Sequence, residues 1–268
     1  MQEFRHIMFY EDKHIYHNTV SREIYQSVTQ TISKIKPEVN WDYWAVYKYL
    51  ETLGSVRPHD SHEMIWFNGG WVNYLDYLDE ATKVRKKWSN KGKVAREKGT
   101  FIHLYLENLF NNKVISVPTQ YKDNIEGANR FYKDHKHWTP IYAELIVADD
   151  DYKIAGQVDR PFFVEPGILD VYDWKTDSEI KTENKYSTLL PPVDDLPDCN
   201  FSKYTLQLNL YKWIIEKNTE WKVRDLKIVH LTDTNYELYN IPNYNVQPLL
   251  NEVCRTHKQP ETFIKRSN

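Results

Sequence analysis

Apolar and polar positions alternate most clearly in the second half of the chain. From about Tyr142 three runs follow one another, IYAELIVA, IAGQVDRPFFVE and ILDVYDWKT. The segments between them, DDDYK and PG, are typical of tight turns. We therefore expect three consecutive strands, the last two joined as a hairpin.

Helical periodicity surrounds these strands. Residues 82–110 form the most strongly helical segment, and SKYTLQLNLYKWIIEKN places Leu206, Leu210, Trp213 and Ile214 on one apolar face. LKIVHLT and YELYNIP predict two more strands, and VQPLLNEVCRTHK predicts a last helix. This order predicts an α/β or α+β core, with a central mixed sheet flanked by helices.

The first 80 residues have a different pattern. HIMFYEDKHIYHN predicts a short hairpin, and residues 21–80 are expected to be mostly helical. Ser27 is a candidate cap for a helix that begins near Val28 and ends before Pro37, and WDYWAVYKYLETLG predicts a helix that stops at Gly54. We expect a helical region, 1–80, packed on a core formed by 81–268, with the aromatic residues mainly in core and interface packing.

Composition narrows the class of protein. With 27% charged and 41% hydrophobic residues among 268, a soluble globular protein is expected. No window approaches the roughly 20 apolar residues of a membrane span, and the N-terminus lacks the apolar run of a signal peptide. We therefore expect a cytoplasmic protein without a membrane partner. Two cysteines are too few for a disulfide framework, a four-thiolate zinc site or an iron–sulfur cluster.

Charged residues interrupt the predicted sheet. On the third strand Asp173 and Lys175 continue the face of Leu169 and Val171. A hairpin through the PG turn would place Asp159 opposite Asp173. Two converging carboxylates repel each other, and a divalent cation such as Mg²⁺ or Mn²⁺ relieves that repulsion. The alternative is a structural ion pair between Asp173 and Lys175.

Four ordered motifs resemble a known family. GQVD and DWKT resemble the strand motifs of the PD-(D/E)XK nuclease superfamily. The upstream GT..H...E pattern, with Gly99, Thr100, His103 and Glu107, and the downstream pair Gln207 and Tyr211 are similar to the RecB-like exonuclease branch. The match spans roughly residues 95–215, and each motif alone would be weak.

The resemblance implies roles for these residues. His103, Asp159 and Asp173 would bind one or two Mg²⁺ or Mn²⁺ ions, with the backbone carbonyl of Trp174 as a further ligand. Lys175 would be the catalytic lysine, and Gln207 and Tyr211 would position the water, the lysine or a phosphate. Glu144 would assist a second metal. Glu107 would orient His103 or pair with a surface lysine. Asp149, Asp150 and Asp151 are interpreted as a solvated turn.

A basic run precedes the histidine motif. It contains Lys83, Arg85, Lys86, Lys87, Lys91, Lys93, Arg96 and Lys98. Such a run is either a solvated helix face or a surface that contacts phosphates. The net charge of −3 shows no global polyanion-binding signature, so a DNA-binding surface would be local.

The resulting hypothesis is a metal-dependent deoxyribonuclease. We expect a stand-alone, phage-type exonuclease acting on DNA ends or single strands in recombination, repair or phage DNA processing, in a bacterial or phage-infected cell. No GxxxxGK[ST] helicase motif is present. The alternatives are a catalytically silent nuclease fold that binds DNA or protein, and an endonuclease with the same site.

Overall fold

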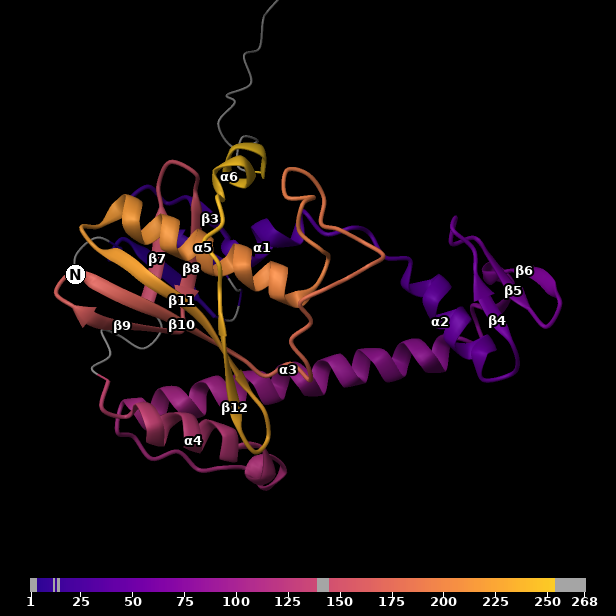
Figure 1. Cartoon of the computed structure of the whole chain (residues 1–268), viewed down its shortest axis with the longest axis horizontal. Coiled ribbons are helices and arrows are strands. Elements are labelled where there is room, and N and C mark those ends of the chain that lie inside the picture. Colours follow the sequence, from indigo (N-terminus) through magenta and orange to yellow (C-terminus); the bar gives the residue numbers. More distant parts are fainter. Residues whose placement is uncertain (1–3, 12, 14, 139–144, 254–268) are drawn as a thin grey trace, which may run out of the picture. The chain divides into compact units, whose positions relative to one another are not determined.

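The structure is a computed structural model that describes residues 4–11, 13, 15–138 and 145–253 (Figure 1). It contains two compact units, one of residues Met1–Pro37 with Phe101–Asn268 and the other of residues Glu38–Thr100. The long helix α3 (Thr82–Phe110) contributes residues to both. The sequence placed a boundary at residue 80, whereas the compact units divide the chain after residues 37 and 100.

The first unit is built on two sheets. One has five strands in the order β1-β2-β3-β8-β7, with bounds Ile7–Tyr10, Ile15–Asn18, Ile24–Ser27, Ile154–Val158 and Leu145–Asp149. The other has four in the order β12-β11-β10-β9, with bounds Tyr236–Asn240, Lys222–Leu231, Ile168–Lys175 and Arg160–Glu165. Both sheets are mixed. In the first, β3 runs parallel to β8 and β7 antiparallel to β8; in the second, β10 runs parallel to β11 and antiparallel to β9. The mixed α/β fold class is confirmed. The prediction of a single strand for IAGQVDRPFFVE is wrong, because β8 and β9 are separate strands on either side of Asp159 and belong to different sheets.

Helices cover both faces of the four-stranded sheet. Leu169 and Val171 of β10 belong to one core with Leu206 and Leu210 of α5 (Asn200–Asn218). Tyr172 and Trp174, which alternate with them, belong to a second core that includes residues of α3 and of α4 (Glu126–His135). The first core also takes in α1 (Val28–Ser33) and α6 (Gln247–Val253). The strand therefore sends alternate side chains into two different cores.

The start of α1 follows the sequence prediction. The Ser27 side chain accepts a hydrogen bond from the Gln30 backbone N–H at 3.0 Å, and the Gln30 side chain accepts one from the Ser27 N–H at 2.9 Å. This reciprocal pair is a capping box, which satisfies backbone donors that a helix start leaves open.

The second unit departs from the helical prediction. Besides α2 (Trp41–Glu51) and the first part of α3, it contains an antiparallel sheet of β4 (Val56–Pro58), β5 (Met64–Phe67) and β6 (Gly70–Asn73). Two 3-10 turns, η1 (Tyr74–Tyr77) and η2 (Thr119–Asn124), lie in the second and first units respectively.

Asn68 and Gly69 form the two-residue loop that joins β5 to β6, and both have positive φ, 46° and 103°. An Asn-Gly pair suits that loop, because these residues tolerate left-handed backbone. The prediction that 21–80 is mostly helical is therefore wrong for residues 56–73.

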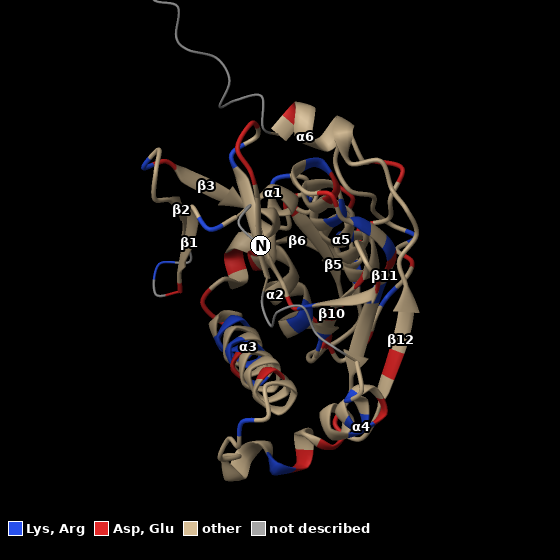
Figure 2. Ribbon diagram, turned by 90° about the vertical axis from the view of Figure 1, so that its left-hand side faces the viewer, with Lys and Arg blue, Asp and Glu red and all other residues tan. Residues whose placement is uncertain are grey.

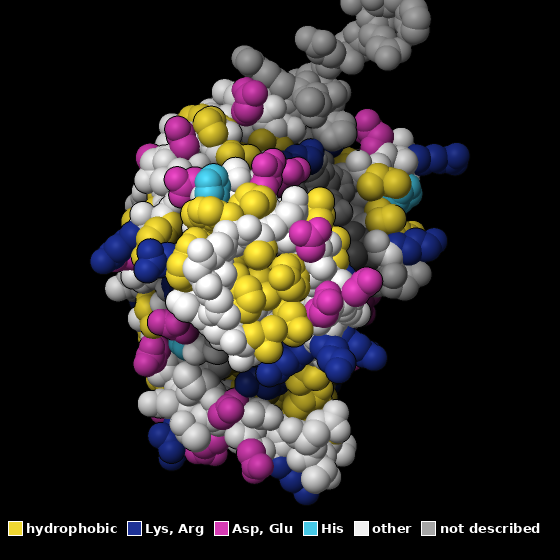
Figure 3. Space-filling view, turned by 90° about the vertical axis from the view of Figure 1, so that its right-hand side faces the viewer, with side chains coloured by type: hydrophobic (Ala, Val, Ile, Leu, Met, Phe, Trp, Pro, Cys, Tyr) yellow, Lys and Arg dark blue, Asp and Glu magenta, His cyan; other side chains and the backbone are white. Residues whose placement is uncertain are grey.

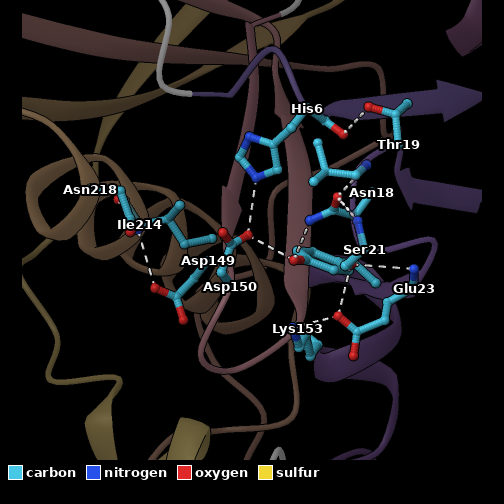
Figure 4. A network of polar contacts seen from close by, with 12 residues as sticks. His6, Asn18, Thr19, Ser21, Glu23, Asp149, Asp150, Lys153, Ile214 and Asn218 are labelled. Atoms are coloured by element: carbon cyan, nitrogen blue, oxygen red, sulfur yellow. Dashed lines mark hydrogen bonds and ion pairs between the residues drawn. The ribbon is translucent and has the colours of Figure 1, made fainter.

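The three consecutive aspartates form part of a polar network (Figure 4). Asp149 is fully buried, and it binds Lys217 and Asn218 at the C-terminal end of α5. Asp150 accepts a hydrogen bond from the Tyr25 hydroxyl at 2.7 Å and lies 3.0 Å from His6. The interpretation as a solvated turn is wrong for Asp149, because a cation from a distant helix compensates its burial.

None of the described helices combines the length and the apolar character needed to cross a lipid bilayer.

Candidate active site

Strand β10 brings Asp173 and Lys175 to the face covered by α5. The Lys175 ammonium forms an ion pair with Oδ2 of Asp173. The Asp173 side chain is 2% exposed and that of Lys175 is 16% exposed, so the pair is almost completely removed from water. A buried carboxylate costs free energy unless it is paired, and the lysine two residues away provides the partner.

Asp159 occupies the single position between β8 and β9. Because Arg160 is in register with Tyr172, Asp159 lies next to the Asp173–Trp174 end of β10, as the hairpin predicted. Its Oδ2 accepts a hydrogen bond from the Trp174 backbone N–H at 2.9 Å. The break between β8 and β9 thus places the Asp159 carboxylate against the backbone of β10, next to Asp173.

His103 approaches from α3. Its Nδ1 lies 3.5 Å from Oδ2 of Asp159, and its ring meets the Trp174 ring edge to face at 5.8 Å between centroids. The imidazole is 30% exposed, so one side of the group remains open to solvent. Of the predicted residues, His103, Asp159, Asp173 and Lys175 are therefore brought together.

Helix α5 completes the group with two residues one turn apart. Nε2 of Gln207 donates hydrogen bonds to Oδ1 of Asp173 at 3.3 Å and to the Tyr211 hydroxyl at 3.0 Å. Both side chains are buried. The chain thus positions Asp173 from two elements, with Lys175 on one oxygen and Gln207 on the other.

Close packing explains the glycine of the GQVD motif. A Cβ built on Gly156 would lie 2.5 Å from Cε1 of Tyr211 and 3.2 Å from Cγ2 of Val28. The first separation is far below van der Waals contact. Only glycine lets β8 approach the Tyr211 ring, so this residue sets the distance between the strand and α5.

Burial and the neighbouring charges shift the pKa values of all four ionisable groups. Burial raises the pKa of Asp173 to about 6, and repulsion from Asp159 adds to this while Lys175 opposes it. Burial would also raise the pKa of Asp159, but His103 and Lys175 hold that pKa below its ordinary value. Burial would lower the pKa of Lys175 and that of His103, and the two carboxylates raise both instead. The site therefore favours the charged forms of Asp159, His103 and Lys175, while burial disfavours the charged form of Asp173.

Two residues that the sequence analysis did not select also contact Lys175 electrostatically. Its ammonium lies over the Tyr204 ring, 4.7 Å from the centroid. The Tyr204 hydroxyl donates a hydrogen bond to Oδ2 of Asp177 at 2.6 Å, and Asp177 raises the pKa of Lys175. Helical spacing was the available signal, because Tyr204 precedes Gln207 by three residues and falls on the same face.

Two other predicted residues, Glu107 and Glu144, are not part of the group in the described residues. Glu144 lies outside the described residues. The Glu107 carboxylate has no hydrogen bond or ion pair among the described residues, and its charge acts on Arg160, a buried cation that lies over the Phe110 ring. Its predicted role as a partner of His103 stays a prediction.

The side chains of the site can be compared with the ligands that the predicted metal ion requires. Asp159 and Asp173 offer the carboxylate oxygens that Mg²⁺ and Mn²⁺ prefer, and Oδ2 of Asp173 has no hydrogen-bond partner among the described residues besides its ion pair. Within the described ranges, however, no three His, Cys, Asp or Glu side chains come together as a metal-holding group. Two carboxylates thus fit the chemistry of a divalent ion, while the full ligand set stays a prediction.

The basic run lies on the second unit's part of α3. Figure 2 shows the Lys and Arg positions of this helix as blue segments of its ribbon. Arg85 binds Asp42, and Lys93 lies 3.8 Å from Glu97. Others form no ion pair with the described residues and are exposed, namely Lys83, Lys86, Lys87, Lys91 and Arg96.

Comparisons with known proteins find little. No family model matches the chain, and no curated protein matches it. Among solved structures, one named "Putative exonuclease" from Eubacterium rectale is similar with a TM-score of 0.39 and 16% sequence identity. The similarity covers 61% of this chain and 64% of that chain, so it spans less than two thirds of that protein.

Proposed function

We propose that this protein is a metal-dependent deoxyribonuclease that hydrolyses phosphodiester bonds, with an exonuclease as the favoured form. The main supporting observation is that His103 of α3, which lies far earlier in the sequence, approaches the strand residues Asp159, Asp173 and Lys175. His103 lies 3.5 Å from Asp159, and Lys175 forms an ion pair with Asp173 at one end of β10.

The order of the motifs supports the same conclusion. The histidine helix, the two acidic strand positions, the lysine and the Gln-Tyr helix follow one another along the chain as in the RecB-like branch of the PD-(D/E)XK superfamily. In the fold they come from α3, the β8–β9 break, β10 and α5. A structural ion pair between Asp173 and Lys175 would not by itself require His103 to lie near Asp159 or Gln207 to bind Asp173.

Each residue has a task in the proposed reaction. Asp159, Asp173 and His103 would hold one or two Mg²⁺ or Mn²⁺ ions, with the Trp174 carbonyl and Glu144 as further ligands. When bound, such an ion supplies a nucleophilic water at neutral pH and screens the phosphate charge. Lys175 would orient that water or stabilise negative charge that develops on the phosphate. Gln207 and Tyr211 would keep Asp173 and Lys175 in position.

The basic residues of α3 would contact the DNA backbone. Lys83, Arg85, Lys86, Lys87, Lys91, Lys93, Arg96 and Lys98 would neutralise phosphates and release counterions. The aromatic-rich second unit would add stacking contacts.

Purified full-length protein with labelled DNA and Mg²⁺ or Mn²⁺ tests the proposal. We expect cleavage by the wild type and a loss of about a hundredfold or more in rate for Asp173→Asn and for Lys175→Ala. Asp170→Asn is the matched control, because Asp170 is a buried acid on the same strand whose carboxylate binds Arg224 instead of the site. Cleavage by all four proteins at one rate would refute the proposal.

A catalytically silent binding module is the second candidate. The observation that favours it is the lack of a three-ligand acidic or histidine group among the described residues. A thermal shift with Mn²⁺ separates the two, because an ion that binds the folded protein raises its melting temperature. We expect stabilisation of the wild type that Asp159→Asn removes.

Closed circular DNA distinguishes an exonuclease from an endonuclease. An exonuclease requires an end, so we expect degradation of linear DNA while the circle stays intact. Cutting of the circle at a comparable rate would assign endonuclease activity to the same site.

A further inference from the structure

The outer face of the three-stranded sheet carries a cross-strand row of aromatic and cationic side chains. Trp66 of β5 is directly opposite Trp71 of β6, and Arg57 of β4 is directly opposite Trp66. Because alternate residues of a strand point to the same side, these three side chains share one face of the sheet. The opposite face is the one that carries Ile65, which is fully buried in the core of this unit.

Two members of the row are exposed, and Trp66 is half-buried. Trp71 is 52% exposed and Arg57 is exposed. The Arg57 guanidinium lies over the Trp66 ring at 5.0 Å, and the His59 ring meets the Trp71 ring edge to face at 5.1 Å. Figure 3 shows hydrophobic side chains gathered on an exposed face, with Lys and Arg as well as Asp and Glu side chains beside them. We call Arg57, His59, Trp66 and Trp71 the tryptophan platform.

We propose that the tryptophan platform stacks unpaired bases of single-stranded DNA. An antiparallel sheet with outward aromatic rings can stack against bases of any sequence. The flat faces of the bases are free for such stacking only when the bases are unpaired. This inference rests on the proposed nuclease function, which it deepens by naming the form of the substrate.

Charge favours a nucleic-acid strand over an apolar partner. A cation in register with the rings places positive charge where a phosphodiester backbone would pass. The same unit carries the exposed basic run of α3, with Lys83, Lys86 and Lys87 lacking ion pairs among the described residues. An apolar protein partner would gain nothing from these charges, whereas a single strand uses both the rings and the cations.

Binding of a fluorescent 20-nucleotide oligo-dT to the full-length protein tests the platform. EDTA is present throughout, so cleavage plays no part and failure of the nuclease proposal would not affect the result. We expect the wild type to bind oligo-dT more tightly than a duplex of equal length. Trp71→Ala and Trp66→Ala should each weaken oligo-dT binding roughly tenfold, and Trp71→Phe should restore most of it.

Trp41→Ala is the matched control, because Trp41 is an exposed tryptophan of the same unit, 64% exposed against 52% for Trp71, that lies on α2. Circular dichroism confirms that each variant is folded. Unchanged oligo-dT affinity in the folded platform variants, or an equal loss with Trp41→Ala, would overturn the inference. Duplex binding as tight as oligo-dT binding, or tighter binding of oligouridine, would also overturn it. A dimer that Trp71→Ala abolishes would assign the face to a second copy of the chain instead.

Discussion

At the scale of single residues, the group around Asp173 shows how a buried charge is retained. One carboxylate oxygen meets Lys175, and the other accepts a hydrogen bond from Gln207. The neighbouring Asp159 is held by the Trp174 N–H and lies near His103. Removal of Lys175 would leave Asp173 without its cation, and removal of Gln207 would take a hydrogen bond from the same buried carboxylate, so these positions tolerate little change.

Gly156 provides a prediction about packing beneath the site. Gly156→Ala places a methyl group 2.5 Å from the Tyr211 ring, which belongs to the core. We expect the free energy of unfolding to fall by about 1–3 kcal/mol, because overpacking forces the ring or the strand to move. Urea denaturation followed by circular dichroism measures the change.

The control for this prediction is Gly92→Ala on α3. A Cβ there meets nothing closer than the Arg96 side chain at 3.5 Å. Alanine is a better helix former than glycine, so this substitution should leave stability unchanged or raise it slightly. Equal unfolding midpoints for the two variants would contradict the packing argument.

At the scale of elements, the C-terminal turn of α4 holds a buried histidine. His135 is almost fully buried, its Nδ1 lies 2.8 Å from the Phe131 carbonyl oxygen, and its ring packs against Trp138. Burial lowers the pKa of His135, and the nearby charges of His137 and Lys227 act in the same direction, while the Phe131 carbonyl and Asp134 oppose it. The folded protein therefore prefers the neutral imidazole.

This preference predicts the pH dependence of stability. Because the unfolded chain binds the proton more readily, stabilisation by neutral His135 is complete above the ordinary histidine pKa of about 6.5 and decreases as the pH falls below it. Urea unfolding at pH 7.5 and pH 5.5 measures the loss. We expect His135→Gln to lose less stability between these pH values than the wild type, and an identical loss would contradict the assignment.

At the scale of the whole molecule, the candidate active site and the basic run belong to different compact units. The residues of the candidate active site belong to the first unit, and the basic run from Lys83 to Lys98 belongs to the second. The chain has a net charge of −3, so this run is a local basic segment within a slightly acidic protein. Electrostatic attraction to DNA would then depend on that segment.

Salt dependence tests this distribution. Each phosphate contact contributes a slope of about −0.7 to −0.9 to the plot of log affinity against log salt concentration. The combined substitutions Lys83→Gln, Lys86→Gln and Lys87→Gln should reduce the magnitude of the slope by about 2–3. Fluorescence anisotropy with EDTA between low and moderate salt provides the measurement.

The control for the salt experiment replaces exposed lysines of the first unit. Lys113→Gln, Lys122→Gln and Lys133→Gln change the net charge equally. We expect their slope to equal that of the wild type. If both triple variants lose the same slope, the attraction reflects net charge and the basic run has no special role.

Local patterns were sufficient for much of the chain. The periodicity of residues 200–218 predicted α5, the capping residue Ser27 marked the start of α1, and alternation in 168–175 correctly assigned Asp173 and Lys175 to one face. These features depend on neighbours within a few residues, and such interactions can be inferred from sequence spacing. The fold class followed from the order of the elements.

Residues 56–73 show where this reasoning failed. Their aromatic side chains also suit a helix, so the helical prediction was made although the Asn68-Gly69 pair is a hairpin signal. Asp149 was misjudged for another reason. Its partner Lys217 is 68 residues away, and no local pattern shows that α5 ends beside β7.

The sequence by itself determined most of the elements of this protein and the chemical types of its candidate site, because side-chain periodicity and the residues of each motif are properties of short segments. Only the tertiary structure decided that Asp159 meets the Trp174 N–H, that Tyr204 lies over Lys175 and that Gly156 must accommodate Tyr211. These contacts depend on how strands and helices pack, and packing is fixed by the fit of whole surfaces that are distant along the chain.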